Sequence, residues 1–249
     1  MTHEPGSRRP LFFIHVMKTA GATLRDHLRE QFTPEEVYPS PPYETDLHYD
    51  STSVERLRTL STQRREPLRL YMGHFPFMAI DFVDREVETL TVLREPIERT
   101  VSMLKHLRVW VPAKRDCTLE EIYDDPWLQA WYLQNGQVKI FALRSDDLDH
   151  DVNDQTYMHH VDVDEHRLKL AKANLERIDL MGFADSFDEF LDRLEVRFGW
   201  SFRRDRRRNV SATAPDVTES LLRRIRRDLE ADIDFYDHAL RLAGRRPTS

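Results

Sequence analysis

Short apolar runs along the chain alternate with segments whose apolar residues recur every three or four positions. Runs of about five apolar residues are typical of strands buried on both faces, whereas the wider spacing is typical of helices that pack one face on a sheet. The runs predict strands over residues 11–16, 68–72, 89–93 and 178–183.

Helical spacing follows the first, third and fourth of these runs. It predicts helices over residues 19–32, 54–60 and 221–240, and others that begin at Pro96 and Phe187. Pro96 suits the first position of a helix, where its missing N–H needs no partner. Asp216, with Glu219 three residues later, has the pattern of a helix start. The proline-rich stretch 34–49 predicts a loop.

The alternation of strands and helices implies right-handed crossovers, and so a sheet with helices on both sides. We therefore predict an α/β fold, P-loop-like, in which three αβα layers enclose a central, mainly parallel sheet. The chain has no internal repeat and no low-complexity linker, so residues 1–249 are predicted to form one domain, with residues 1–10 as a disordered tail.

Composition narrows the protein class. Of the 249 residues, 40% are hydrophobic and 33% are charged, a balance typical of folded proteins. No apolar stretch approaches the roughly 18 to 20 residues that a membrane span requires, and the run after residue 10 is too short for a signal peptide. We therefore predict a cytoplasmic protein. The net charge of −7 argues against a general nucleic-acid binder. Cys117 is the single cysteine, predicted to be a bland loop thiol, so no intrachain disulfide forms.

The turn at residues 15–23, between the first predicted strand and helix, has the features of an anion site. Backbone N–H groups at a helix start attract phosphate, and Lys18 adds a full positive charge. Gly21 permits close approach of the backbone, and Thr19 and Thr23 offer hydroxyl donors. The spacing differs from the standard P-loop. The alternative is an ordinary strand-to-helix turn with a surface lysine.

A second candidate phosphate site follows the strand at 89–93. Arg94 lies at the carboxyl end of that strand, where ligands gather in open α/β sheets. Ser102 lies six residues beyond Pro96, about 9 Å along a helix, so the two side chains are able to hold one phosphate from two sides. Glu98 and Arg99 form either a surface pair or part of a structural ion pair that fixes the turn. Ser102 is alternatively a solvated helix residue.

Together the two turns resemble motifs of the PAPS-dependent sulfotransferases, which use 3′-phosphoadenosine 5′-phosphosulfate, and in particular the heparan sulfate 2-O-sulfotransferase-like branch. The first resembles the 5′-phosphosulfate loop Pro-Lys-Thr-Gly-Gly/Ser-Thr, and the second the 3′-phosphate motif Arg-Asp-Pro-x-x-Arg with its following serine. Further similar stretches occur in the same order at 73–77, 135–139, 181–187, 209–211 and 234–236. Met17, Ala20 and Ala22 depart from the first motif, and Glu95 from the second. The alanines remove one hydroxyl and some backbone freedom.

The resemblance implies a role for each motif residue. Lys18 is expected beside the bridging oxygen of the leaving phosphate, with Arg94 and Ser102 on the 3′-phosphate. Most arginines of the basic run 203–208 are expected to be solvated, and some of them either to clamp the nucleotide or to bind a sulfated or otherwise anionic acceptor. The residues implied in nucleotide binding are Lys18, Thr19, Ala20, Gly21, Ala22, Thr23, Arg94, Ser102, Arg206 and Arg208. No metal is expected.

A general base is needed to take the proton of the acceptor hydroxyl, and the resemblance implies His74, which follows the flexible Gly73. The alternative for His74 is a turn histidine bonded to backbone. His48 is a rival base. His15 is predicted to pack within or behind the site. The adjacent His159 and His160 would face opposite ways on a strand and are not predicted to bind metal.

The acceptor is predicted to be a hydroxyl of a small molecule, lipid or sugar. Trp127, Trp131 and Tyr132 have helical spacing and are predicted to pack in the core rather than form an acceptor platform. Two other functions remain open. One is an ATP- and Mg²⁺-dependent phosphotransferase, and the other is a non-catalytic nucleotide- or RNA-binding module that uses residues 203–208.

Overall fold

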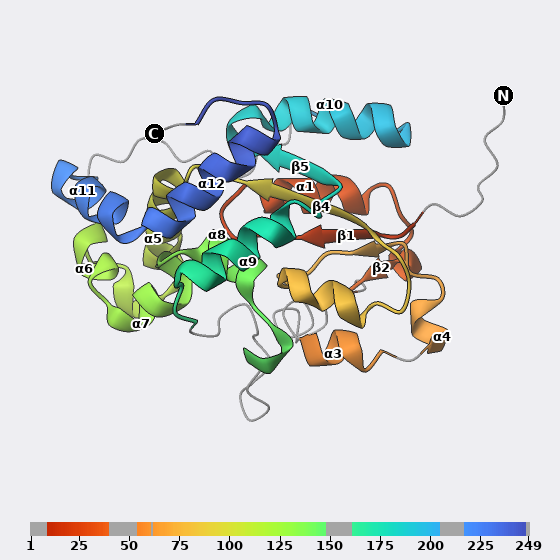
Figure 1. The fold of residues 1–249 in the computed structure, drawn as a ribbon, viewed down its shortest axis with the longest axis horizontal. Helices are drawn as coiled ribbons and strands as arrows, with labels where there is room; N and C mark the ends of the chain where they lie inside the picture. The colour runs from red at the N-terminus through yellow and green to blue at the C-terminus, as the bar shows by residue number, and fades with distance from the viewer. Residues whose placement is uncertain (1–8, 40–53, 61, 148–160, 205–216, 248–249) are drawn as a thin grey trace.

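A parallel sheet lies at the centre of the computed structural model, which describes residues 9–39, 54–60, 62–147, 161–204 and 217–247. Its five strands have the order β2-β3-β1-β4-β5, and every neighbouring pair is parallel (Figure 1). The strands are β1 Leu11–Ile14, β2 Val37–Tyr38, β3 Leu70–Tyr71, β4 Glu88–Leu93 and β5 Leu180–Phe183.

The four predicted strands are confirmed, each within one residue of or inside its predicted bounds. The sequence missed β2, which lies in the stretch predicted to be a loop. Its two residues are too few to make an apolar run, but they pair with β3 at Val37↔Leu70 and Tyr38↔Tyr71. The sheet is parallel throughout the described strands, so its predicted, mainly parallel character is confirmed.

Alternate residues of the strands face two separate cores. Along β1, Leu11 and Phe13 belong to one core, and Phe12 and Ile14 belong to the other. The first core is covered by helices α1 Gly21–Arg29 and α10 Phe187–Phe198. The second is covered by α5 Pro96–Trp110, α8 Gly136–Ala142, α9 Glu165–Leu175 and α12 Glu230–Leu242 (Figure 1). The predicted α/β fold with helices on both faces of the sheet is therefore confirmed.

The described residues form further helices besides several 3₁₀ turns. They are α3 Val54–Arg58, α4 Thr62–Arg65, α6 Leu119–Tyr123, α7 Pro126–Leu128, a π-helical turn Gln129–Leu133, and α11 Glu219–Asp228. The predicted helix start near Asp216 is corrected, because the cap of α11 is Thr218, whose hydroxyl accepts from the N–H of Leu221 at 3.1 Å. Asp216 itself lies outside the described residues. No helix among those described is long and apolar enough to cross a membrane.

At its amino-terminal edge the sheet includes part of the predicted tail. The carbonyl of Pro10 accepts from the N–H of Glu88 at 2.8 Å, and Pro10 is buried. Residues 1–8 of that tail lie outside the described residues.

The strand order makes the carboxyl ends of β1 and β4 a topological switch point of the sheet. From β1 the chain crosses toward β2 on one side of the sheet, and from β4 it crosses toward β5 on the other. Where connections diverge in this way, the loops open outward and ligands bind between them. The turns after β1 and β4 are the two candidate phosphate turns, and the turn after β3 carries His74 at the same edge.

Candidate functional site

The turn between β1 and α1 has an unusual backbone. Lys18 and Ala20 have φ angles of 67° and 70°, in the left-handed region that side chains with a Cβ rarely adopt. Each such residue costs about 1–3 kcal/mol, and such strain is concentrated at binding sites. Ala20 is the N-cap of α1 and provides no side-chain hydrogen bond to the first turn. The helix therefore begins without a cap from its own N-cap side chain, so that side chain does not satisfy any of its first N–H groups.

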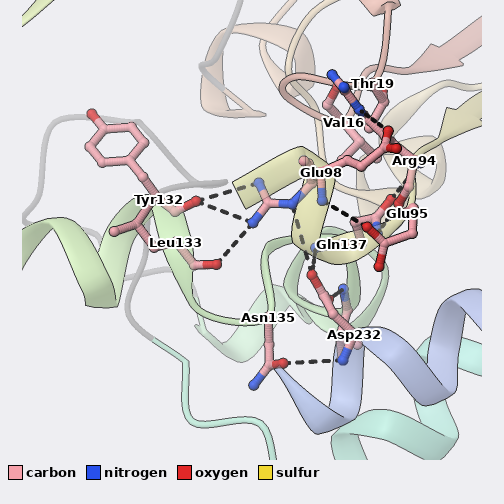
Figure 2. A network of polar contacts seen from close by, with 12 residues as sticks. Val16, Thr19, Arg94, Glu95, Glu98, Tyr132, Leu133, Asn135, Gln137 and Asp232 are labelled. Atoms are coloured by element: carbon pink, nitrogen blue, oxygen red, sulfur yellow. Dashed lines mark hydrogen bonds and ion pairs between the residues drawn. The ribbon is translucent and has the colours of Figure 1, made fainter. Parts of the chain in front are cut away.

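Both threonines of this turn are buried, which is unfavourable for a role of their hydroxyls in binding a ligand. The Oγ1 of Thr19 donates to the carbonyl of Val16 at 2.9 Å, and the Thr19 side chain is fully buried (Figure 2). Thr23 is also buried, whereas Ala20 and Ala22 are partly exposed. The hydroxyl hydrogen of Thr19 thus holds the turn together, and Thr19 can serve a ligand as a donor only through its backbone.

Gly21 makes room for a histidine. A Cβ at this position would lie 2.1 Å from Cδ2 of His15. The His15 ring stacks on Phe13 at 5.0 Å and on His74 at 4.1 Å, so the predicted packing role of His15 is confirmed. Burial lowers the pKa of His15 well below its ordinary value, with further lowering by the charges of His74, Arg25 and Lys18. His15 is therefore neutral at physiological pH.

Arg94 joins the second turn to the first. Its Nη1 donates to the carbonyl of Lys18 at 3.4 Å, and its Nε contacts Glu98 at 3.3 Å. Burial lowers the pKa of Lys18, and the nearby charge of Arg94 lowers it further. Two cations thus lie close together at this edge of the sheet, and a bound anion would relieve their repulsion.

The backbone of Arg94 is held from behind by Gln137. The N–H of Arg94 donates to Oε1 of Gln137 at 3.1 Å, and Nε2 of Gln137 donates to the Arg94 carbonyl at 2.8 Å. Gln137 is fully buried in the first turn of α8. This paired contact fixes the position of the turn independently of the arginine side chain, which is 24% exposed.

Arg99 and Asp232 are both buried. Figure 2 shows Asp232 beside Asn135 and Gln137. Nε of Arg99 lies 3.9 Å from Asp232, and Nη2 of Arg99 donates to the carbonyl of Leu133 at 2.9 Å. The Asp232 carboxylate accepts from the N–H groups of Gln137 and Val138 at 3.3 and 2.8 Å. Burial raises the pKa of Asp232, and the charge of Arg99 and these N–H bonds oppose the rise. Of the two sequence interpretations of Arg99, the structural ion pair is confirmed.

Residues 135–139, a stretch that the sequence analysis singled out, belong to this network. Asn135 has φ 49° and its Oδ1 accepts from the N–H of Asp232 at 3.1 Å. A Cβ on Gly136 would lie 2.9 Å from Nη2 of Arg99. Sequence reasoning missed Asp232 because it lies about a hundred residues away on α12 and carries no motif of its own.

Of the remaining residues predicted to bind the nucleotide, the structure describes some and not others. Ser102 lies on the second turn of α5 and is 5% exposed, so its hydroxyl is nearly enclosed. Arg206, Arg208 and the rival base His48 lie outside the described residues, as do His159 and His160. Arg204 pairs with Asp192 and Glu195 of α10, each at 2.7 Å.

His74 lies in the turn after β3, partly exposed. Its Nδ1 is 3.0 Å from the carbonyl of His15. Because a carbonyl only accepts, Nδ1 carries the hydrogen, and the neutral ring has its lone pair on Nε2. The backbone bond expected of a turn histidine is present, and it sets the tautomer that a general base needs.

A cavity of about 180 Å³ opens beside His74. One wall is a single face of α5, formed by Met103, His106, Leu107 and Trp110. The other wall is formed by Met17, His74 and Tyr132. Burial lowers the pKa of His106, as does the charge of Lys18. Sequence reasoning missed His106, although its i, i+3, i+4, i+7 spacing with the other three α5 residues was a signal.

The expectation that the three aromatic residues at 127–132 pack in the core is only partly correct. Tyr132 is 5% exposed, but Trp127 is 54% exposed and lies over Trp131 at 5.8 Å and Tyr132 at 5.7 Å. Trp127 is therefore a surface residue above a buried tyrosine. Cys117 is partly buried in the loop before α6, where its Sγ contacts the carbonyl of Ala113 at 3.8 Å.

Neither a comparison with protein-family models nor one with curated proteins finds a match for this chain. The function is therefore inferred from the residues and their geometry.

The strain at Ala20 gives a stability prediction. Ala20→Gly is expected to raise the free energy of unfolding by about 0.5–1 kcal/mol, because glycine adopts φ 70° without steric cost and this gain exceeds its entropic cost. Urea unfolding followed by circular dichroism measures the change. The matched control is Ala22→Gly inside α1, which is expected to lower stability by about 0.5 kcal/mol. Equal losses in both variants would contradict a strained turn.

Proposed function

We propose that this protein is a sulfotransferase that moves a sulfuryl group from 3′-phosphoadenosine 5′-phosphosulfate to an acceptor hydroxyl. One observation carries the proposal: Nη1 of Arg94 lies 3.4 Å from the carbonyl of Lys18, at the carboxyl ends of the neighbouring strands β1 and β4. The two turns that resemble the 5′- and 3′-phosphate motifs are thus neighbours. Two adjacent anion sites suit a nucleotide that carries phosphate at both ends of its ribose.

The donor set fits such an anion. An ammonium, a guanidinium and the start of α1 all lie at the carboxyl edge of the sheet, and each favours negative charge. The finer fold type is part of the same proposal. The lysine-bearing turn joins the central strand β1 to α1, as in P-loop-like folds, and this supports that assignment.

Different residues of the chain carry out different parts of the proposed reaction. In the transfer, the acceptor oxygen bonds to sulfur while the bond from sulfur to the 5′-phosphate oxygen breaks. Nε2 of His74 takes the acceptor proton, since Nδ1 is already protonated and bonded to His15. Lys18 and the N–H groups at the start of α1 stabilise the charge that develops on the leaving phosphate. Arg94 holds the 3′-phosphate, with Ser102 beside it on α5.

Nucleotide binding provides the first test. Calorimetry with adenosine 3′,5′-bisphosphate in the presence of EDTA is expected to show one site. Lys18→Ala and Arg94→Ala are each expected to weaken binding about 10- to 100-fold, because each removes a charged hydrogen bond worth about 1.5–3 kcal/mol. The control is Lys169→Ala, which removes a cation from the exposed Glu165 pair and is expected to leave affinity unchanged.

The same titration separates the alternatives. Tighter binding of ATP with Mg²⁺ than of the bisphosphate would favour a phosphotransferase. Binding only to RNA, with strong salt dependence, would favour a nucleic-acid module. Either result would overturn the sulfotransferase proposal.

The assignment of the base has its own test. His74→Ala is expected to lower the turnover of radiolabelled sulfuryl transfer about 10²- to 10⁴-fold and to spare bisphosphate affinity. The control is His166→Ala, at an exposed position on α9. Full turnover in His74→Ala would remove His74 from the scheme, and a loss confined to His106→Ala would transfer the role to His106.

A further inference from the structure

The side chain of Gln137 contacts the main chain of Arg94 just beyond the end of the sheet. Strand β4 ends at Leu93, whose register partner on β5 is Phe183. Arg94 follows directly, and its N–H and its carbonyl meet the Gln137 amide at 3.1 and 2.8 Å. The amide therefore does for Arg94 what a neighbouring strand does inside a sheet, because it satisfies both polar groups of the main chain.

Contacts on both sides of Arg94 fix its main chain. Gln137 is fully buried, and its own N–H donates to the carboxylate of Asp232 at 3.3 Å. A buried amide that lost its partners would lose free energy, so other rotamers of Gln137 are disfavoured. On the other side of Arg94, the carboxylate of Glu95 caps α5 by accepting from the N–H of Glu98 at 2.7 Å. Only the side-chain torsions of Arg94 are left to place its guanidinium.

The guanidinium of Arg94 is held less firmly than its main chain. Nη1 lies 3.4 Å from the carbonyl of Lys18, and Nε lies 3.3 Å from the carboxylate of Glu98 (Figure 2). Both distances exceed the usual range of about 2.7–3.2 Å for an N–H···O bond. These side-chain contacts are therefore too weak to set the position of the guanidinium, which depends instead on where the main chain starts the side chain.

Recognition of a phosphate by arginine depends on alignment. The guanidinium must direct its N–H groups at the phosphate oxygens, because hydrogen bonds weaken steeply as their angle departs from linearity. A shift of the Arg94 main chain would move the end of this long side chain out of alignment. The groups proposed to hold the 5′-phosphate, Lys18 and the start of α1, have no printed contact with Gln137. A change at Gln137 therefore acts on the contact of Arg94 with the 3′-phosphate.

We propose that Gln137 is a positioning residue that makes the site specific for nucleotides phosphorylated at the 3′ position. Gln137 is fully buried and acts through the main chain of Arg94 rather than by touching the nucleotide. The inference rests on the proposed sulfotransferase function, in which Arg94 holds the 3′-phosphate. It requires that discrimination between adenosine 3′,5′-bisphosphate and adenosine 5′-monophosphate depend on Gln137.

A double-mutant cycle on binding tests the proposal without catalysis. Calorimetry measures the Kd of adenosine 3′,5′-bisphosphate for the unaltered full-length protein, Gln137→Met, Arg94→Ala and the double variant. Methionine resembles glutamine in length but offers neither amide group. Gln137→Met is expected to weaken binding about 5- to 20-fold when Arg94 is present, and at most about twofold when position 94 is alanine, because the effect passes through Arg94. Equal losses in the two backgrounds would overturn the proposal.

A second ligand and a matched variant distinguish positioning from a general loss of stability. Adenosine 5′-monophosphate lacks the 3′-phosphate, so its affinity for Gln137→Met is expected to stay within about twofold of that for the unaltered protein. The matched variant is Asn174→Leu, because the Asn174 amide on α9 also donates to a main-chain carbonyl, that of Phe141, at 2.8 Å. It is expected to lower stability and to spare bisphosphate affinity. Equal weakening of both ligands by Gln137→Met, or the same effect from Asn174→Leu, would leave Gln137 a purely structural residue and overturn the proposal.

A measurement on the unaltered protein keeps the proposal testable if Gln137→Met does not fold. In protein labelled with ¹⁵N-glutamine, the side-chain amide resonance of Gln137 is expected to shift on addition of adenosine 3′,5′-bisphosphate and to stay in place with adenosine 5′-monophosphate. Gln63, exposed on α4, is the internal control and is expected to stay in place with both. No shift of the Gln137 resonance at saturating bisphosphate would contradict the positioning role.

The outcomes separate this inference from the function on which it rests. If the unaltered protein does not bind adenosine 3′,5′-bisphosphate, the sulfotransferase proposal fails, and the role of Gln137 fails with it. If the bisphosphate binds but the effects of Gln137→Met and Arg94→Ala are additive, the sulfotransferase proposal stands and the positioning role of Gln137 is wrong.

Discussion

The carboxylate of Asp232, buried between α8 and α12, connects the turn after β4, the second candidate phosphate turn, to the helices packed behind it. It accepts from the first N–H groups of α8, at Gln137 and Val138, and lies against the buried guanidinium of Arg99. The side chain of Gln137 then holds the backbone of Arg94 at both its N–H and its carbonyl. A buried charge without its partner is strongly destabilising, so this network locks one geometry.

That rigidity explains how two cations stay close together at the carboxyl edge of the sheet. Lys18 lies in a left-handed turn and Arg94 donates to its carbonyl. Burial lowers the pKa of the lysine, and the charge of Arg94 lowers it further. Free side chains would separate. Here the backbone of each is fixed by contacts that the side-chain charges do not supply, including the bond from Thr19 to Val16 on the lysine side. The backbone of the proposed anion site is therefore held in place by the protein's own contacts.

The sequence analysis correctly predicted those features of the fold that depend on local residue patterns. Apolar runs located four of the five strands, and the strand-turn-helix pattern placed Lys18 and Arg94 at one edge of the sheet. The sequence analysis missed β2, because its two residues join the sheet through pairing with β3 and have no apolar run of their own. It also missed Asp232 and His106, because their roles depend on contacts between distant segments: α12 with α8, and α5 with the turns after β1 and β3. Trp127 was misjudged because helical spacing does not show which face of a short helix is covered.

The account depends on two turns that hold opposite ends of one nucleotide, and ³¹P NMR of adenosine 3′,5′-bisphosphate tests this directly because its two phosphates give separate resonances. Both are predicted to shift on binding. Lys18→Ala is predicted to diminish mainly the shift of the 5′-phosphate, and Arg94→Ala mainly that of the 3′-phosphate. The account would be contradicted if both substitutions acted on the same phosphate, or if neither resonance shifted with the unaltered protein.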